Sequence, residues 1–358
     1  MATTGNSRRR PTISDIAKAA HVSKTTVSRF INGRTDELSP DLAARVEATI
    51  RELDYHPSAV ARSLRSHRSY TVGVLVANIA TPFGTSIVSG VSERLREAGY
   101  TAIVVAADDS AQRQGELADT LLRHQVDGLI VNSATDKDHD LVRLGDRGVP
   151  VVLVDRAVEG ADFDIALSTY DASMRALVEH LAEQGFARAA LFTEPFVEVG
   201  PRRDRHEAFC AVDCGAFGSP DPEADVFVVN PWEHETVDAA LDELLATTDG
   251  PPAIVATNTL TLIGAFNAIQ RRGLSMPQDV GLCGPDDWGW AHRMGWDWPE
   301  SLGPGVTTMV TRPYSMGFAA ADLMVTRLAQ PERAHETRDI PTDVVFRAST
   351  LLGRAQAS

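Results

Sequence analysis

Residues 12–29 read TISDIAKAAHVSKTTVSR, and this stretch carries the signals for two short helices joined by a tight turn. Thr12 followed by Asp15 predicts a capping box, in which side-chain oxygen atoms accept the unpaired N–H groups of a first helical turn. Small and apolar residues then recur at helical spacing, namely Ile13, Ile16, Ala17 and Ala20. The pair His21-Val22 interrupts this spacing and predicts the end of the first helix.

A second helix is predicted to begin after Ser23, whose hydroxyl can cap it. Its inner face is apolar and contains Val27, Phe30 and Ile31. Its outer face is polar and contains Lys24, Thr25, Ser28 and Arg29. Asn32-Gly33 marks its end, because glycine readily adopts the left-handed conformation that closes a helix. The pair is typical of a helix-turn-helix unit whose second helix reads DNA, and an ordinary helical hairpin is the alternative.

The motif continues along the chain. The pattern T-I-x-D-I-A-x-x-A-x-V-S-x-x-T-V-S-R-x-I-N is followed by Ser39-Pro40, Val46, Ile50, Leu53, Tyr55, Pro57 and Ala61-Arg62-Ser63-Leu64. This ordered series resembles the DNA-binding head of the lactose-repressor family of bacterial transcription regulators. The resemblance extends over almost the whole chain and implies a sequence-specific DNA-binding regulator.

The resemblance also indicates which residues contact DNA. Lys24 and Thr25 would supply most of the sequence specificity, with Arg29 at a base edge or a phosphate. Residues 57–69 would form a hinge helix that folds on DNA and wedges Leu64 into the minor groove, and a plain linker is the alternative. The expected DNA contacts are Thr12, Ser23, Lys24, Thr25, Thr26, Ser28, Arg29, Ser58, Ala61 and Leu64.

Charge is distributed unevenly along the 358 residues, whose net charge is −15. The first 70 residues contain 12 Lys and Arg against 7 Asp and Glu, whereas the remainder contains 22 against 42. A basic head is attracted to phosphates, and an acidic body is repelled by them. We therefore expect the chain to dock on DNA by its head.

Several classes of protein are excluded by composition. No apolar run approaches the ~20 residues of a membrane span. The basic residues 8–10 are not followed by an apolar signal segment, so we expect a cytoplasmic protein without a membrane partner. Cys210, Cys214 and Cys283 have no His or carboxylate partners at zinc spacing, which favours structural thiols. We expect neither a metal nor a cofactor.

From Tyr70 onward, apolar runs such as TVGVLVA (71–77) alternate with helical segments, and the alternation starts again after Tyr170. This order predicts two doubly wound parallel sheets in tandem. The tandem resembles the periplasmic sugar-binding protein fold, in which the chain crosses three times between two subdomains. The expected crossings lie near 165–170, 307–313 and 334–339.

The expected architecture is an N-terminal all-α helix-turn-helix head with a hinge helix, joined to an α/β periplasmic-binding-protein-like body of two doubly wound parallel-sheet subdomains. Residues 1–10 would be a disordered tail, 11–56 the DNA-binding domain and 57–69 the hinge helix and linker. Residues 70–358 would bind an effector and form the dimer. The subdomains would comprise about 70–167 with 312–335, and about 168–308 with 336–358.

Polar residues follow the predicted strands, and ligands of open α/β sheets bind at the carboxyl ends of strands. Asp155-Arg156, for example, follows the strand PVVLV. By resemblance, Arg205 is the effector-binding arginine. The expected effector contacts are Asn78, Phe83, Asp155, Arg203, Arg205, Asn258, Asp286 and Trp288. Planar Arg, Asp and Asn side chains form paired hydrogen bonds to hydroxyls or to a carboxylate, which suits a sugar or a sugar acid.

A Trp-rich stretch, residues 288–298, is longer than the corresponding loop of the family. Trp288, Trp290 and Gly303-Pro304-Gly305 resemble members thought to sense sugar acids. The Trp side chains would either stack on a ligand ring at the mouth of the cleft or cover an apolar surface or dimer contact.

The expected function is an effector-controlled repressor of carbohydrate-metabolism genes, acting as a homodimer on a pseudo-palindromic double-stranded operator. A solute-binding protein of a sugar transport system and an effector-dependent activator are the alternatives. An enzyme is not expected, because no dinucleotide, P-loop or nucleophile-elbow motif is present. The terminal residues LLGRAQAS lack leucine heptads, which favours a dimer over a tetramer.

Overall fold

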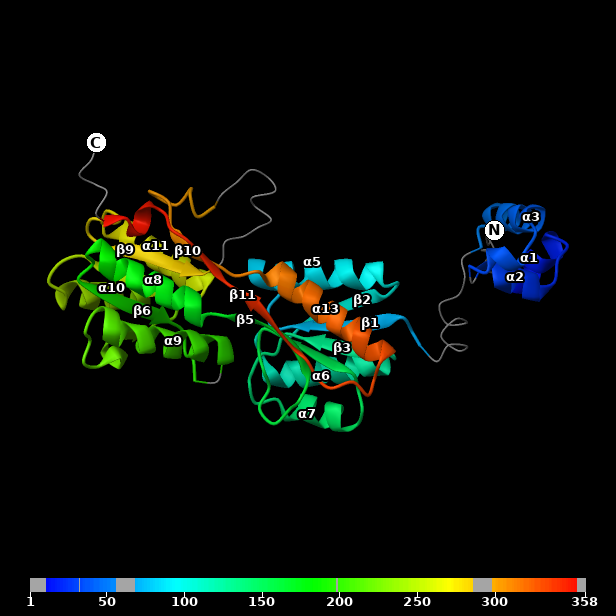
Figure 1. The fold of residues 1–358 in the computed structure, drawn as a ribbon, viewed down its shortest axis with the longest axis horizontal. Helices are drawn as coiled ribbons and strands as arrows, with labels where there is room; N and C mark the ends of the chain where they lie inside the picture. The colour runs from blue at the N-terminus through cyan, green and yellow to red at the C-terminus, as the bar shows by residue number, and fades with distance from the viewer. Residues whose placement is uncertain (1–10, 32, 56–67, 198, 286–297, 353–358) are drawn as a thin grey trace, which may run out of the picture. The chain divides into compact units, whose positions relative to one another are not determined.

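The computed structural model describes residues 11–31, 33–55, 68–197, 199–285 and 298–352. The predicted tail and most of the predicted hinge lie outside this part, as do the expected contacts Ser58, Ala61, Leu64, Asp286 and Trp288. The chain divides into a head, Met1–Ser69, and a body, Tyr70–Ser358 (Figure 1). Within the described part, no helix is both long and apolar enough to cross a membrane.

The described part of the head consists of short helices around a small apolar core. They are α1 (Ile13–Ala19), α2 (Lys24–Ile31), the 3-10 turn η1 (Thr35–Glu37) and α3 (Pro40–Glu52). Both halves of the predicted Thr12–Asp15 capping box are present. Ser23 Oγ accepts the Thr26 N–H at 3.0 Å, as predicted. Ser39 is the N-cap residue of α3, and its side chain accepts no N–H of this helix.

The core of the head joins α1, α2 and α3. Its buried members are Ile16, Ala17, Ala20, Val27, Val46 and Tyr55. The partly buried Phe30, Ile50 and Leu53 pack against them, which confirms the predicted inner face. Burial of these side chains leaves the opposite face of α2 to solvent.

The first lobe of the body is a parallel sheet with helices on both faces. Its strands, in spatial order, are β11 (Thr337–Pro341), β5 (Asp164–Thr169), β4 (Val151–Val154), β3 (Gly128–Val131), β1 (Thr71–Val76) and β2 (Thr101–Ala106). One face carries α5 (Pro82–Glu97) and α13 (Pro313–Ala329), which lie side by side in Figure 1. The other face carries α6 (Ala111–Arg123) and α7 (His139–Asp146).

The second lobe repeats this plan. Its strands, in spatial order, are β12 (Asp343–Val345), β10 (Thr307–Val310), β9 (Gly281–Pro285), β8 (Pro252–Ala256), β6 (Arg188–Thr193) and β7 (Val226–Val228). The pairing of β12 with β10 is antiparallel, and the other pairings are parallel. Short 3-10 turns, η2 (Pro222–Asp225) and η3 (Ala348–Thr350), flank the sheet.

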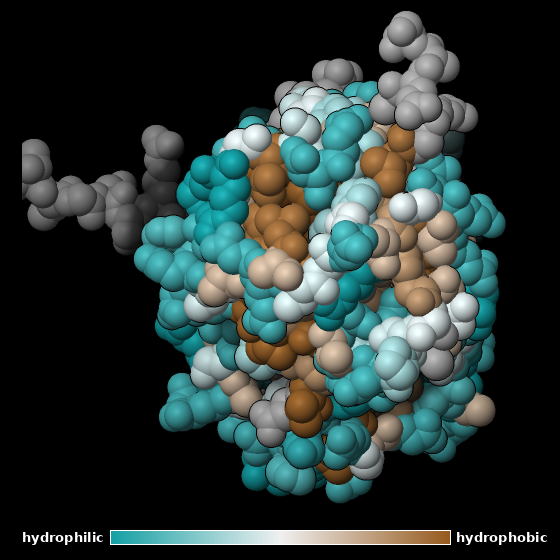
Figure 2. Space-filling view, turned by 90° about the vertical axis from the view of Figure 1, so that its left-hand side faces the viewer, coloured by the Kyte–Doolittle hydropathy of each residue, from teal (hydrophilic) through white to brown (hydrophobic). Residues whose placement is uncertain are grey.

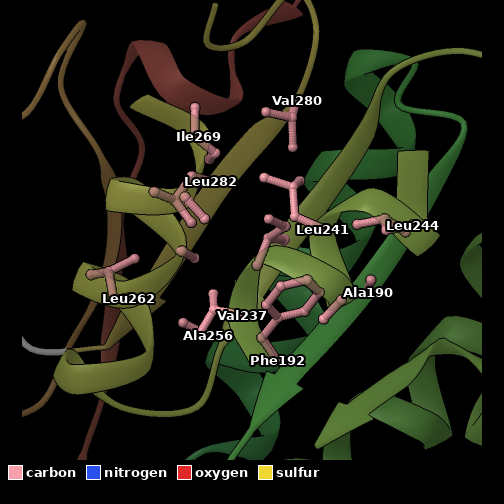
Figure 3. Close-up of a cluster of buried hydrophobic side chains, with 14 of the residues drawn as sticks. Ala190, Phe192, Val237, Leu241, Leu244, Ala256, Leu262, Ile269, Val280 and Leu282 are labelled. Carbon is pink, nitrogen blue, oxygen red and sulfur yellow. The ribbon is translucent and has the colours of Figure 1, made fainter. Parts of the chain in front are cut away.

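Helices also cover both faces of the second sheet. One face carries α8 (Asp171–Gln184) and α9 (Gly200–Ala216). The other face carries α10 (His234–Ala246) and α11 (Thr259–Arg271). Figure 3 shows the second interface, where Val237 of α10 lies near the strand residue Phe192 and Ile269 of α11 lies near Leu282 of β9. This two-sided burial explains why the strands read as continuous apolar runs.

The chain crosses three times between the lobes, at Tyr170, at residues 311–312 and at Thr342. The first two crossings agree with the expected positions. The third lies later than the expected 334–339, because β11 pairs with β5 in the first sheet before β12 enters the second sheet. Residues 337–341 therefore belong to the first lobe, and the expected assignment of 336–358 to the second lobe is wrong for them.

The strands β5 and β10 occupy segments that we expected only as crossings. They contain buried polar residues, which obscure the apolar signal of a strand. Asp164 at the start of β5 pairs with Arg327 at 2.8 Å, and Thr307 Oγ1 in β10 accepts the backbone N–H of Arg347 at 2.8 Å.

The end of the body seen in Figure 2 is mostly hydrophilic, with strips of hydrophobic side chains between the polar ones.

Candidate functional site

The outer face of α2 presents polar side chains to solvent. Lys24, Thr25 and Arg29 are exposed, while Val27 on the opposite face is fully buried. Arg29 Nε lies 3.1 Å from a carboxylate oxygen of Glu37 in η1. A surface ion pair of this kind contributes only about 0–1 kcal/mol to stability. Arg29 can therefore exchange Glu37 for a phosphate or a base edge at small cost.

The expected DNA contacts at the helix starts already have structural partners. Thr12 Oγ1 donates to Asp15 at 2.7 Å. The hydroxyl groups of Ser23 and Thr26 share a hydrogen bond of 2.9 Å. These three residues fix where α1 and α2 begin, and Ser28 is half-buried beside them on α2. The exposed pair Lys24 and Thr25 opens α2, which gives it the polar tip that enters a groove in helix-turn-helix proteins.

The body contains a cavity of about 230 Å³ at the carboxyl ends of the strands of both lobes. The first lobe contributes Asn78 and Phe83 after β1, Asp109 after β2, Asn132 after β3, and Asp155 and Arg156 after β4. The second lobe contributes Glu194 after β6, Trp232 after β7, Asn258 after β8, and Arg202 and Arg205 from α9. A cavity at this position is where open α/β sheets bind ligands.

Five of the expected effector contacts line this cavity, namely Asn78, Phe83, Asp155, Arg205 and Asn258. Asp286 and Trp288 lie outside the described residues. The sequence interpretation missed Asn132, Glu194, Arg202 and Trp232. The strand-end rule points to three of these, since they follow β3, β6 and β7. Arg202 precedes Arg205 by three positions, which places both on one face of α9.

Arg205 is the most constrained side chain of the cavity, with 6 % of its surface exposed. Its guanidinium donates to the backbone oxygen of Thr257 at 2.9 Å and to the hydroxyl of Tyr170. The guanidinium carbon also lies 4.1 Å from the centre of the Tyr170 ring, within the range of a cation–π interaction. Because Tyr170 is the first crossing residue, the cavity and the junction between the lobes share this contact.

Glu194 organises the second-lobe wall. One of its carboxylate oxygens accepts hydrogen bonds from Arg202, at 2.8 Å, and from the amide of Asn258. Asn258 Oδ1 in turn accepts the Thr261 N–H at 2.9 Å and caps α11. Burial lowers the pKa of the Arg202 guanidinium, and the neighbouring Glu194 charge opposes this effect. Arg202 is thus a desolvated cation facing the cavity.

The first-lobe wall is built around Asp155 and Arg156. Asp155 has a φ of 67°, in the left-handed region that few non-glycine residues adopt. Its N–H donates to the Ala166 oxygen at 2.7 Å, which holds this turn at the end of β4. Arg156 donates to the Ser133 oxygen at 2.8 Å. Its buried Nε has no hydrogen-bond partner among the described residues.

Arg203 does not line the cavity, contrary to expectation. Its guanidinium lies 2.9 Å from Asp136, a residue of the loop between β3 and α7 in the other lobe. Asp136 also accepts the Gly200 N–H at 2.8 Å, and 3 % of its side chain is exposed. Arg203 and Gly200 therefore bind the start of α9 to the first lobe beside the cavity.

The cysteines also differ from expectation. His206 and Glu223 lie beside Cys210, so the prediction that the thiols have no ligating neighbours is wrong for this residue. Cys283 is fully buried in β9 and donates to the Ile254 oxygen at 3.3 Å, which confirms its structural role.

Comparisons with known proteins place this geometry in a family. The profile described as "Bacterial regulatory proteins, lacI family" matches residues 12–58. The profile described as "Periplasmic binding proteins and sugar binding domain of LacI family" matches residues 69–286. The chain belongs to the LacI family of bacterial transcription regulators.

Individual relatives agree with this assignment. The chain is similar to the HTH-type transcriptional regulator KdgR of Bacillus subtilis, with 30% identity over 94% of this chain and 97% of that protein. It is also similar to the ribose operon repressor of Escherichia coli, with 30% identity over 89% and 94% of the two chains. The crystal structure of the lac repressor dimer bound to operator and the anti-inducer ONPF has the same fold, with a TM-score of 0.80, 24% identity and coverage of 96% and 100%.

Membership of the LacI family indicates the general role of the chain. The chain is a DNA-binding transcription regulator and not an enzyme, and its body is of the sugar-binding type. The polar face of α2 lies within residues 12–58, the part that matches the family's DNA-binding profile.

Proposed function

We propose that this LacI-family regulator represses carbohydrate-metabolism genes, and that a sugar acid bound in the cavity controls its affinity for the operator. The observation that supports an acidic ligand is Arg156, whose guanidinium lines the cavity and forms no ion pair among the described residues. A cation in this position is stabilised by a negatively charged ligand. A carboxylate matches a guanidinium in geometry and charge.

The other walls suit the remainder of a sugar acid. Asp109, Asp155 and Glu194 offer carboxylate oxygens to hydroxyl groups, and Asn132 offers an amide. Phe83 and the 76 % exposed Trp232 offer apolar faces to a ring. The volume of about 230 Å³ lies below the roughly 300–1,000 Å³ of drug-sized sites, which favours a single-ring ligand. A neutral sugar is the second candidate, supported by the three carboxylates.

We propose the following roles for the parts of the chain. Residues 11–56 bind DNA, residues 57–69 form the hinge, and residues 70–358 bind the effector and dimerise. Lys24 and Thr25 read base edges and Arg29 a phosphate or base. Seven further proposed DNA contacts rest on the sequence motif, namely those of Thr12, Ser23, Thr26, Ser28, Ser58, Ala61 and Leu64.

The proposed mode of action is a homodimer on a pseudo-palindromic operator in the cytoplasm, where the DNA is. The lac repressor, which shares the fold, has been crystallised as a dimer on its operator, and the Escherichia coli relative is named as a repressor. The sequence-specific contacts of two heads on two half-sites require this symmetry. The effector acts by binding the two arrangements of the lobes with different affinity.

A ligand screen tests the proposal. Sugar acids and their neutral parent sugars are compared by thermal shift and calorimetry on the full chain, using wild type and Arg156→Gln. We expect a sugar acid to bind more tightly than its parent sugar, and the variant to lose this preference. An Arg143→Gln variant, which changes an exposed arginine on α7, should retain it. If the wild type bound a neutral sugar more tightly than the corresponding sugar acid, the proposal of an acidic ligand would be wrong.

The head is tested separately by selecting binding sites from random DNA. Exchanging Lys24 and Thr25 should change the preferred sequence while leaving the salt dependence of binding nearly unchanged. A consensus that is the same in wild type and variant would contradict the assigned role of these two residues.

A further inference from the structure

A second polar cluster lies on α9, apart from the cavity. His206, Cys210 and Glu223 place their ligating atoms within 4.8 Å of one another. His206 Nε2 is 3.0 Å from Glu223 Oε2 and 3.6 Å from Cys210 Sγ, and Cys210 Sγ is 4.0 Å from Glu223 Oε1. None of the three residues lines the effector cavity.

The local sequence explains why these side chains meet. His206 and Cys210 are four positions apart on α9, so they lie one above the other on the same face. The turn η2 brings Glu223 opposite them. This turn is anchored because Asp225 accepts hydrogen bonds from Arg188 and, at 2.7 Å, from Ser219.

The imidazole is the most rigid member of the cluster. His206 is buried, with 7 % of its surface exposed, and its ring stacks on Phe196 with centroids 4.2 Å apart and planes at 20°. Glu223 is 64 % exposed, so the cluster is open to solvent on that side. A cation can therefore reach a pre-oriented nitrogen ligand from the solvent.

We propose that His206, Cys210 and Glu223 form a three-ligand site for Zn²⁺, with a water molecule completing a tetrahedron. The ligand set combines thiolate, imidazole and carboxylate, all of which bind zinc. Zinc bond lengths of about 2.0–2.3 Å place tetrahedral ligand atoms about 3.3–3.7 Å apart. The 3.6 Å between His206 Nε2 and Cys210 Sγ falls in this range. Glu223 Oε2 lies 3.0 Å from the imidazole nitrogen and Oε1 lies 4.0 Å from the sulfur, so a rotation of the exposed Glu223 side chain is needed to bring one oxygen to both ligand atoms.

The charges around the cluster favour a cation. Burial raises the pKa of the Cys210 thiol to about 11, and the carboxylates of Glu223, Asp213 and Asp225 add to this effect. The thiol is therefore protonated at neutral pH without a metal, and zinc binding displaces its proton to solvent. Arg188, the cation paired with Asp225, offsets part of the negative charge.

Cobalt substitution tests the site on the full chain, because Co²⁺ bound by a thiolate has a charge-transfer absorption that other ligands lack. We expect wild type to bind one Co²⁺ with this absorption, and Zn²⁺ to displace it. Cys210→Ser should abolish the absorption. His206→Asn and Glu223→Gln should weaken binding by about tenfold or more, since loss of a ligand exceeds the 10–100-fold effect of losing a supporting partner.

Matched variants separate the site from general thiol or histidine binding. Cys283→Ala removes a buried thiol elsewhere, and His234→Asn removes an exposed imidazole, so both should bind cobalt like wild type. Glu223 is exposed, so Glu223→Gln should fold normally and remain informative if His206→Asn does not fold. Absence of the absorption in wild type, or its persistence in Cys210→Ser, would overturn the site and leave a hydrogen-bonded cluster only.

Discussion

Tyr170 connects the ligand chemistry to the movement of the lobes. It is the residue at which the chain first leaves the first lobe, and its hydroxyl and ring both hold Arg205. The contact of Tyr170 with Arg205 is therefore shared by the cavity and the junction between the lobes. The coupling is physical, because Arg205 cannot shift without changing its contacts with Tyr170.

We predict that Tyr170→Phe weakens effector binding by about tenfold. The variant keeps the ring but removes the acceptor of a charged hydrogen bond, and such bonds contribute about 1.5–3 kcal/mol. Calorimetry with the effector found in the screen measures the change, and operator binding without effector should be normal. Tyr100→Phe, which removes a hydroxyl away from the cavity, serves as the control. Equal affinity in Tyr170→Phe and wild type would refute the positioning role.

The helices α5 and α13 pack closely against each other at two glycines. A Cβ built on Gly90 would lie 2.0 Å from the Tyr314 oxygen, and one on Gly317 would lie 2.1 Å from the Ile87 oxygen. Backbone lies against backbone at both points, and the neighbouring atoms cannot rotate away. The two glycines therefore set the distance between these helices.

We predict that Gly317→Ala destabilises the body by about 1–3 kcal/mol, the usual cost of overpacking. Urea unfolding measures it. Gly264→Ala in α11 is the control, because its Cβ would meet only ordinary contacts at 3.6 Å and beyond. The control should be neutral or more stable by up to about 1 kcal/mol, since alanine favours helix over glycine. Similar destabilisation in both variants would contradict the close-packing explanation.

A partly buried network of ion pairs joins α13 to α5 and β11. Asp322 accepts hydrogen bonds from Arg94 of α5 at 2.9 Å and from Arg338 of β11 at 2.6 Å. Burial raises the pKa of Asp322, and the hydrogen bonds from Arg338 and Arg94 lower it. The lowering outweighs the effect of burial, so the pKa lies below its ordinary value. A depressed carboxyl pKa stabilises the fold above the unfolded pKa of about 3.9, and this contribution is lost as pH falls through the folded pKa.

The predicted result is that Asp322→Asn destabilises the chain at pH 7, and that the difference from wild type shrinks as the pH falls below about 4. Urea midpoints at several pH values measure both quantities. Glu179→Gln alters an exposed pair with Arg175 at 3.7 Å and should have little effect at any pH. A difference that is independent of pH would show that the charge of Asp322 is not responsible.

At the scale of the whole molecule, Asp136 links the two lobes beside the cavity. Its buried carboxylate binds Arg203 and the Gly200 N–H of the second lobe, whereas its backbone belongs to the first. Because this contact exists only when the lobes approach, it stabilises the arrangement that closes the cavity. Breaking it should favour a more open arrangement.

Asp136→Asn should therefore weaken effector binding several-fold, because the competent arrangement becomes less populated, while the residues lining the cavity stay unchanged. Calorimetry measures affinity, and hydrogen exchange should become faster in the first turn of α9. Asp140→Asn, at an exposed pair with Arg143, is the control and should behave like wild type. Unchanged affinity in Asp136→Asn would mean that the contact does not influence closure.

The helix-turn-helix of the head and the alternation of strands and helices in the body can be predicted from the amino-acid sequence. Local signals suffice there: a capping box, helical spacing of apolar residues, and strand runs buried on both faces. The fold class, the two helices of the helix-turn-helix and the strand-end location of Asn78, Asp155 and Asn258 follow from these signals. They depend on residues close together in the chain, and such patterns can be read without coordinates.

Which polar side chains contact one another depends on how the whole chain folds. Arg203 and Arg205 are two positions apart, yet Arg203 pairs with Asp136 of the other lobe while Arg205 reaches the cavity. The sequence also did not predict strand β5 or the contact of Cys210 with Glu223. Asp164 in β5 pairs with Arg327, and Cys210 contacts Glu223, so both contacts join residues from different elements. The physical reason is that burial of a charge or thiol depends on partners brought together by folding, and spacing along the sequence does not encode them.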